Sequence, residues 1–247
     1  MKGFLAALQF LTIIKVSEDP DITGEDLARS MAYYPVVGFL IGLTLVAARF
    51  VFSLFLPLPV VDILVIAVLV ILSGALHLDG FADTIDGLAG GKDREKTLAI
   101  MKDNKIGSFA VVGLILLMIL KVSAMIEIPA EIKNSALLIM PTLGRWSTVQ
   151  MASGFSYARS GNGTALVFTR FAGRKEYVIS TLITAAILIG LFQLKGLLIM
   201  LLIAAVTLLL GLFFKRRIGG VTGDIMGAAN EINEVVTLLM ICGLFGA

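Results

Sequence analysis

The sequence contains few charged residues, one cysteine and one histidine. Only 15% of its 247 residues are charged, whereas 58% are hydrophobic, and the mean hydropathy is +0.97. A water-soluble domain of this length carries far more charge on its surface. The composition therefore predicts a polytopic membrane protein. The lone Cys242 excludes a disulfide framework and a cysteine-based zinc site, and a net charge of +2 gives no indication of nucleic-acid binding.

Three common catalytic signatures are also missing. The sequence has no GxxxxGK[ST] phosphate loop, no GxSxG nucleophile turn and no HExxH zinc helix. An ATPase of the P-loop type therefore has no support. No convincing internal repeat is present either.

Long apolar runs predict an all-α, polytopic helical membrane protein with six to seven transmembrane helices in a single domain, residues 1–247. The run at residues 1–14 is too short to span a bilayer, and no cleavage site follows it, so we expect a short interfacial or re-entrant helix there. The last expected span is short unless its helix begins earlier, near Ile225. The expected spans are Met31–Leu56, Val60–Leu76, Ile106–Ile128, Ser135–Ser153, Tyr177–Leu194, Gly196–Phe214 and Val235–Ala247.

Positive charge is concentrated on alternate loops. These loops, together with Lys2 and Lys15, hold 15 of the 20 Lys and Arg residues, whereas the intervening loops hold only Lys133 and Lys195. Loops rich in Lys and Arg face the cytoplasm. The acid-rich and glycine-rich segments lie on the same side, which predicts an active site that opens to the cytoplasm, built from segments 77–108 and 215–234.

Segment Gly74–Ser108 separates two apolar runs and carries three carboxylates on one helical stripe. Asp79, Asp83 and Asp86 follow one another at intervals of four and three. Like charges stacked in this way repel one another, so we expect a bound cation. Mg²⁺ prefers oxygen ligands and shares itself with substrate phosphates. The alternative is a solvated helix end, but the glycines and alanines between the acids favour close packing beside a ligand.

His77 is the only histidine and is a candidate general base or substrate partner. On a continuous helix it points away from the acidic stripe, and its other interpretation is a polar residue at the membrane boundary.

Residues 102–105 place two cations around an acid just before an apolar run. A topology anchor explains part of this charge. Asp103 and Asn104 fit that role less well and are candidate oxygen ligands, while Lys102 and Lys105 are candidate phosphate contacts.

A second basic cluster, residues 215–217, runs into a glycine-rich turn and then into a segment with Asp224 and Glu231 seven residues apart. Glycine-rich turns let backbone N–H groups approach phosphate closely. The alternative is again a topology anchor. Arg145, inside an expected span, should face the bundle interior and pair with an acid or a phosphate, whereas Lys121 is able to snorkel to the interface.

Three separated motifs resemble the cobalamin synthase family, the adenosylcobinamide-GDP ribazoletransferases: GALHLDGFADTIDGL, IMKDNKIGSFA and RRIGGVTGDIMGAANEI. The opening FLAALQFLTIIKV and the YYPVVGFLIG stretch are similar to the same family. The resemblance implies a Mg²⁺-dependent enzyme of the prokaryotic cytoplasmic membrane. It would join adenosylcobinamide-GDP to α-ribazole or its 5′-phosphate and release GMP.

On this interpretation each candidate residue receives a role. The metal ligands are Asp79, Asp83, Asp86 and Asp224, and the proton acceptor is His77 or Asp103. The substrate contacts are Lys102, Asn104, Lys105, Arg145, Arg217, Gly223 and Glu231.

Two alternatives compete with this assignment. Asp83-Thr84-Ile85-Asp86-Gly87 matches the first half of the CDP-alcohol phosphotransferase motif, but glycines replace the Ala-Arg that follows and the second half is absent. An ion-coupled transporter would carry acids near the bilayer midplane and an inverted repeat. The expected partners are the two substrates and the lipid bilayer, and a homo-oligomer or an assembly with other corrinoid-pathway enzymes stays open.

Overall fold

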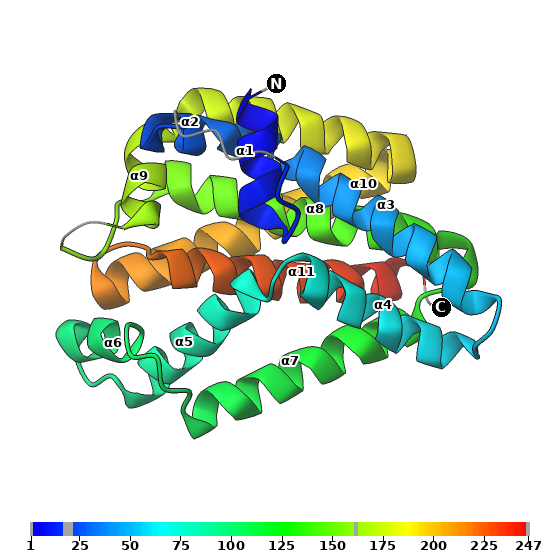
Figure 1. The fold of residues 1–247 in the computed structure, drawn as a ribbon, viewed down its shortest axis with the longest axis horizontal. Helices are drawn as coiled ribbons and strands as arrows, with labels where there is room; N and C mark the ends of the chain where they lie inside the picture. Colours follow the sequence, from blue (N-terminus) through cyan, green and yellow to red (C-terminus); the bar gives the residue numbers. More distant parts are fainter. Residues whose placement is uncertain (1, 17–21, 161–162, 246–247) are drawn as a thin grey trace.

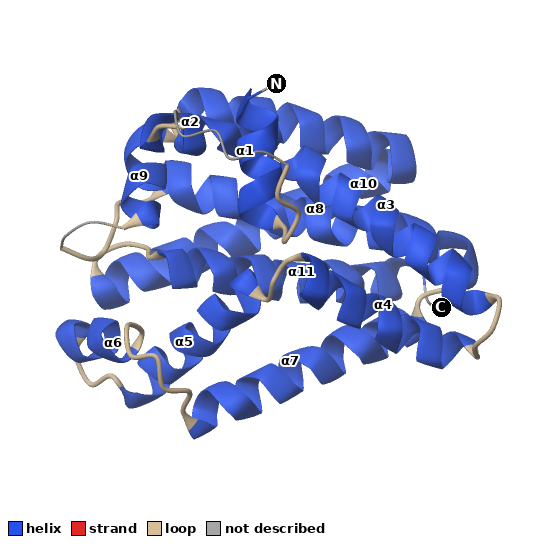
Figure 2. Cartoon of the chain, in the orientation of Figure 1, coloured by secondary structure: helices blue, strands red, loops and turns tan. Residues whose placement is uncertain are grey.

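The computed structural model describes residues 2–16, 22–160 and 163–245, and within them the chain is helical, with no β-strand (Figure 2). The first three helices are short: α1 (Lys2–Leu11), α2 (Gly24–Arg29) and the 3₁₀ helix η1 (Ser30–Tyr33). The remaining elements are α3 (Tyr34–Ser53), α4 (Leu58–Leu72), α5 (Leu76–Gly90), α6 (Arg94–Ile100), α7 (Ser108–Glu127), α8 (Ala130–Gly154), α9 (Thr164–Phe171), α10 (Arg174–Ile218) and α11 (Gly223–Phe245).

Four helical segments in the described ranges are long and apolar enough to cross a membrane, or five if the bent pair α4–α5 forms one span. They are Gly24–Ser53, Ser108–Glu127, Arg174–Ile218 and Gly223–Phe245. This supports a helical membrane protein, but the predicted count of six to seven spans is not confirmed. The expected span at Ser135–Ser153 lies in α8. This helix is long, but it contains many polar residues, and most of it packs inside the bundle.

The segment α10 consists of two helices joined by a sharp reversal. Gln193 has non-helical angles (φ 52°, ψ −132°). A Cβ at Gly196 would lie 2.4 Å from the carbonyl oxygen of Leu188, although eight residues of straight helix extend about 12 Å. The reversal falls at the boundary between the two spans expected at Tyr177–Leu194 and Gly196–Phe214.

A second break separates α4 from α5, where the axis turns by 89°. Gly74 and Ala75 both have positive φ, 58° and 55°, and this backbone conformation interrupts the helix. The break matters for function because it turns α5, with its three aspartates, across α11 (Figure 1).

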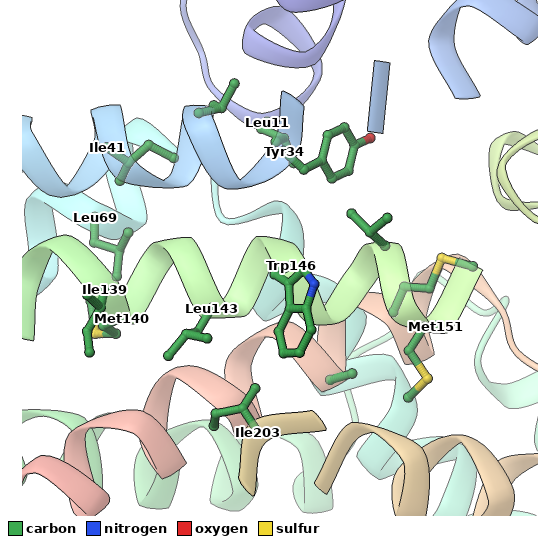
Figure 3. Close-up of a cluster of buried hydrophobic side chains, with 14 of the residues drawn as sticks. Leu11, Tyr34, Ile41, Leu69, Ile139, Met140, Leu143, Trp146, Met151 and Ile203 are labelled. Carbon is green, nitrogen blue, oxygen red and sulfur yellow. The ribbon is translucent and has the colours of Figure 1, made fainter. Parts of the chain in front are cut away.

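Helices α8 and α11 form the centre of the bundle. The α8 helix packs against α3, α10 and α11, while α11 also packs against α5 and α7. The largest buried side chain is Trp146 of α8, whose Nε1 donates a hydrogen bond to the Thr181 hydroxyl at 3.0 Å. Figure 3 shows it among buried aliphatic side chains from neighbouring helices.

Both ends of the chain are helical, as expected. The short α1 packs on η1 and α3 and, in Figure 1, runs across the direction of α3. The last helix begins at Gly223 and has 23 residues. The expected bounds Val235–Ala247 therefore start too late, and the earlier start near Ile225, which the sequence left open, is close to the observed one.

Candidate active site

The site begins where α5 crosses the first turn of α11. A Cβ at Gly80 would lie 2.8 Å from the carbonyl oxygen of Asp224 and 2.9 Å from its Cα, a contact that only glycine permits. One turn away, a Cβ at Gly227 would lie 3.2 Å from the carbonyl oxygen of His77. Small residues on both helices therefore bring the acidic segment of α5 against Asp224.

We expect Gly80→Ala to lower turnover about 100-fold, because an added methyl group must push α5 away from Asp224 and displacements near 1 Å at a reacting centre have effects of that size. The measurement is kcat of the purified variant in detergent. Gly190→Ala is the matched control, since a Cβ at Gly190 meets nothing within 4 Å and should leave turnover unchanged. Equal activities for the two variants would contradict the proposed role of this contact.

The four predicted metal ligands come together only in part. Asp79, Asp83 and Asp86 lie on α5, as expected, and Asp83 interacts electrostatically with Asp224 as well as with the two other acids. Nevertheless, the described residues contain no group of three or more acids, histidines or cysteines placed to hold a metal ion.

Asp86, on α5, caps the N-terminus of α7. Its Oδ2 accepts a hydrogen bond from the Gly107 N–H at 2.5 Å, and its Oδ1 accepts one from the Ala110 N–H at 2.8 Å. Gly107 is the N-cap of α7, so Asp86 supplies from another helix the carboxylate that a capping side chain normally provides. Its predicted role as a metal ligand is untested, and the structure gives it a structural role.

Asp224 lies in the first turn of α11 and pairs with Arg159. The Arg159 Nη2 donates to Asp224 Oδ2 at 2.7 Å, and both side chains are about one-fifth exposed. The Thr222 hydroxyl also donates to Oδ2 at 3.2 Å and accepts a hydrogen bond from the Ile225 N–H. The positive end of the α11 dipole stabilises negative charge at this position.

A polar cavity of about 570 Å³ lies beside this ion pair, and we call it the cationic cavity. Its wall carries three cations, Arg94, Lys102 and Arg159, and two acids, Glu95 and Asp224. Other lining residues come from α6, from the segment before α9 and from the first turn of α11, among them Tyr157, Ser160, Thr164 and Gly223. Helix N-termini with exposed N–H groups bind phosphate well.

A second cavity of about 230 Å³ lies on the other side of Asp224, and we call it the apolar cavity. Its hydrophobic lining includes Phe10, Leu11, Met31, Tyr34, Phe168 and Met226, and its polar wall contains His77, Asp79 and Asp224. The two cavities share Thr164, Ala165, Gly223 and Asp224. Asp224 therefore lies between an anion-attracting pocket and an apolar one.

The two candidate proton acceptors differ in location. His77 is buried in the apolar cavity wall, and its Nδ1 is buried without a hydrogen-bond partner. Asp103 is exposed, lines neither cavity and accepts a hydrogen bond from the Lys105 N–H at 3.2 Å. The geometry therefore favours His77.

The predicted substrate contacts fall into two groups, those that line a cavity and those that do not. Lys102 and Gly223 line the cationic cavity, whereas Asn104 and Lys105 are exposed outside both cavities. Arg217 donates to the Gly91 carbonyl oxygen at 2.6 Å and thereby ties the end of α10 to the segment after α5. Nearby, Arg94 donates to the carbonyl oxygens of Ile218 and Ala158 at 2.7 and 2.9 Å.

Arg145 and Glu231 belong to a buried charge network rather than to the cavities. Lys121 Nζ contacts Glu231 Oε2 at 2.5 Å and Glu234 Oε2 at 2.6 Å, and Arg145 pairs with the other oxygen of Glu234. Asn230 donates to Glu234 Oε1 at 3.1 Å. Ion pairs between α7, α8 and α11 thus take the place of the expected substrate contacts of Arg145 and Glu231. Lys121 does not snorkel to the interface, because Glu231 and Glu234 neutralise its charge inside the bundle.

Four residues of the site were not predicted from the sequence: Arg94 at the start of α6, Arg159, Tyr34 and Thr164. Arg159 lies in the loop after α8, where a cation is easily attributed to topology, and its position beside Asp224 depends on a parallel backbone bridge between Tyr157 and Val221. Tyr34 and Thr164 line the cavities from α3 and α9. The charged, glycine-containing YARSGNGTA sequence was the one available signal for this loop.

Comparisons with known proteins agree over the whole chain. Residues 3–242 match the family model described as Cobalamin-5-phosphate synthase. A relative from Geotalea daltonii, named adenosylcobinamide-GDP ribazoletransferase, is 38% identical over 100% of this chain and 99% of its own length. Relatives of the same name from Acetivibrio thermocellus and Caldanaerobacter subterraneus are 37% and 34% identical, each over 97% of both chains. No solved structure matches.

Proposed function

Because this chain belongs to the cobalamin-5-phosphate synthase family, we propose that it transfers the cobinamide phosphate of adenosylcobinamide-GDP to α-ribazole or its 5′-phosphate. The products are adenosylcobalamin, or its 5′-phosphate, and GMP. The observation that carries this proposal is the position of Asp224, where a cationic cavity meets an apolar one. A transferase in which a nucleoside displaces GMP from a diphosphate needs both environments at one reacting centre.

The diphosphate of adenosylcobinamide-GDP binds in the cationic cavity. Arg94, Lys102 and Arg159 supply positive charge there, and Gly223 at the start of α11 offers backbone N–H groups. Arg159 is the side chain that connects the two halves of the site, because it already pairs with Asp224.

The acids fit a magnesium ion that is shared with the substrate. Mg²⁺ keeps several waters and is usually bound by one or two carboxylates together with substrate phosphates, not by an all-protein cage. Asp224 lines both cavities and Asp79 lines the apolar one, while Asp83 interacts electrostatically with both acids and with Arg159. The lack of a three-acid cluster in the described residues agrees with this mode. When bound, the ion would neutralise charge on the diphosphate.

The transfer step forms one P–O bond and breaks another. A ribose hydroxyl oxygen of α-ribazole attacks the cobinamide-side phosphorus, and GMP leaves with the electron pair of the broken bond. His77 accepts the hydroxyl proton at Nδ1, the atom that has no partner within the described protein. Arg159 and Lys102 hold the phosphate oxygens in place.

The same arrangement supports an orientation in the membrane. In Figure 1, α6, α9 and the outer end of α5 lie at one end of the bundle, while the α3–α4 and α7–α8 turns lie at the other. The end with α6 and α9 carries the loops with most of the Lys and Arg, which supports a cytoplasmic location for it in the inner membrane of a prokaryote. Assembly with copies of itself or with other corrinoid-pathway enzymes stays a prediction.

The test is GMP release by the purified, detergent-solubilised protein. We expect release from adenosylcobinamide-GDP only when α-ribazole and Mg²⁺ are both present. Release of GMP without α-ribazole would indicate hydrolysis and would contradict the proposal. Uptake of the corrinoid by vesicles without any turnover would instead favour the transporter alternative.

A further inference from the structure

We propose that the apolar cavity holds the aromatic base of α-ribazole, and that Tyr34 recognises this base by donating one hydrogen bond to its free ring nitrogen. This inference rests on the proposed function and adds to it the location of the acceptor substrate and the residue that selects it.

The cavity has the lining expected of a site for a flat aromatic ring. Phe168 meets Phe10 edge-to-face, with ring centroids 5.1 Å apart and planes at 81°, and meets Tyr34 in the same way at 6.3 Å and 80°. Leu11 and Met31 are fully buried beside them. Aromatic pairs of this kind offer both ring faces and ring edges to a further ring.

The volume fits a two-ring base. An apolar protein cavity of roughly 150 Å³ binds a benzene ring, and the apolar cavity, at about 230 Å³, is larger. The benzimidazole of α-ribazole has two fused rings and is mostly apolar. A corrin ring is several times larger, so the cavity has no room for the other substrate's macrocycle.

Tyr34 supplies the polar feature that distinguishes such a base from a hydrocarbon chain. Its side chain is only 2% exposed, and its hydroxyl is buried without any hydrogen-bond partner in the described protein. A buried hydroxyl left in this state is costly, so it indicates a missing partner. Figure 3 shows the hydroxyl oxygen of Tyr34 directed away from the labelled core side chains.

The aromatic base needs a single hydrogen-bond donor in an otherwise apolar site, and the Tyr34 hydroxyl is such a donor. One nitrogen of the benzimidazole is bonded to ribose, and the other carries a lone pair that accepts a single hydrogen bond. A lipid tail accepts none. The ribose would then extend toward the polar wall with His77, Asp79 and Asp224, where the cationic cavity begins.

The test combines one variant with one substrate analogue. The analogue is the indole riboside in which the free nitrogen of the base is replaced by C–H, and the variant is Tyr34→Phe. We expect the wild-type protein to prefer α-ribazole over the analogue by about tenfold in kcat/KM, the size of one neutral hydrogen bond. Tyr34→Phe should use both equally, with an unchanged KM for adenosylcobinamide-GDP.

Two further variants complete the experiment. Tyr33→Phe is the matched control, because the neighbouring Tyr33 is 40% exposed and contacts Phe4 outside the cavity. It should keep the wild-type preference. Leu11→Phe fills the cavity and should raise the KM for α-ribazole at least tenfold, without changing the KM for adenosylcobinamide-GDP.

The outcomes separate this inference from the proposed function. If wild-type protein releases GMP in an α-ribazole-dependent reaction but Tyr34→Phe retains the tenfold preference, the base binds elsewhere and the inference is wrong. A Leu11→Phe effect confined to the KM of adenosylcobinamide-GDP would assign the cavity to the corrinoid and also overturn it. No α-ribazole-dependent release by the wild-type protein would contradict the proposed function itself.

Discussion

Replacing Asp224 by asparagine should lower kcat for GMP release by about 100- to 1,000-fold, the loss typical of removing one charged or dipolar group that stabilises a transition state. Asp224 lies between the two cavities and pairs with Arg159. Asparagine has nearly the same shape but no charge, so it cannot offset the guanidinium or hold a cation. The measurement is kcat at saturating substrates, together with the thermal unfolding midpoint.

Asp86→Asn is the control for this prediction. Asp86 caps α7 with both carboxylate oxygens, and asparagine keeps one of these two acceptors, so the variant retains a helix cap with one hydrogen bond fewer. Turnover of this variant should stay within a few-fold of wild type. A loss as large as that of Asp224→Asn would show that Asp86 acts in the reaction, and near-normal turnover of Asp224→Asn would remove Asp224 from the mechanism.

Lys121→Met should reduce the free energy of unfolding by about 3–5 kcal/mol, because removing one partner of a buried ion pair leaves the other partner charged and unpaired. Lys121 is 1% exposed and contacts both Glu231 and Glu234. In the variant Glu231 loses its ion-pair partner, and Glu234 keeps Arg145 and Asn230. The measurement is the unfolding free energy in mixed detergent micelles.

The exposed pair Glu25–Arg29 provides the comparison. It joins residues four apart on α2, and exposed pairs of this type contribute less than about 1 kcal/mol. Arg29→Met should therefore change the unfolding free energy little. A similar loss for the two variants would mean that the buried network contributes no more than a surface pair.

The helices that a single periodic pattern defines were predictable. The common helix of Asp79, Asp83 and Asp86 follows from their spacing along the chain, whereas the start of the last helix was left open between Ile225 and Val235 and lies at Gly223. The boundary between the two halves of α10 was placed within a residue or two of Gln193, because the apolar run is interrupted there.

Tertiary neighbours were not predictable, because spacing within one helix does not say which helix lies opposite. Arg145 was expected to pair with an acid or a phosphate, and its partner is the acid Glu234. Glu231 was assigned to substrate because it shares a helical face with Asp224, but it pairs with Lys121. Similarly, the break at Gly74 and Ala75, which turns α5 onto α11, depends on two positive φ angles that the apolar pattern does not reveal. The pairing of Asp224 with Arg159 likewise depends on a tertiary contact, the backbone bridge between Tyr157 and Val221.

The most direct test of the metal assignment uses Mn²⁺ in place of Mg²⁺, with electron paramagnetic resonance to count bound ions. We expect Mn²⁺ to bind weakly to the protein alone, because the described residues hold no preformed three-acid cluster. Binding should become tight when adenosylcobinamide-GDP is added, and Asp224→Asn should abolish that gain. Tight binding without substrate that is unchanged in Asp224→Asn would contradict a metal ion shared between Asp224 and the diphosphate.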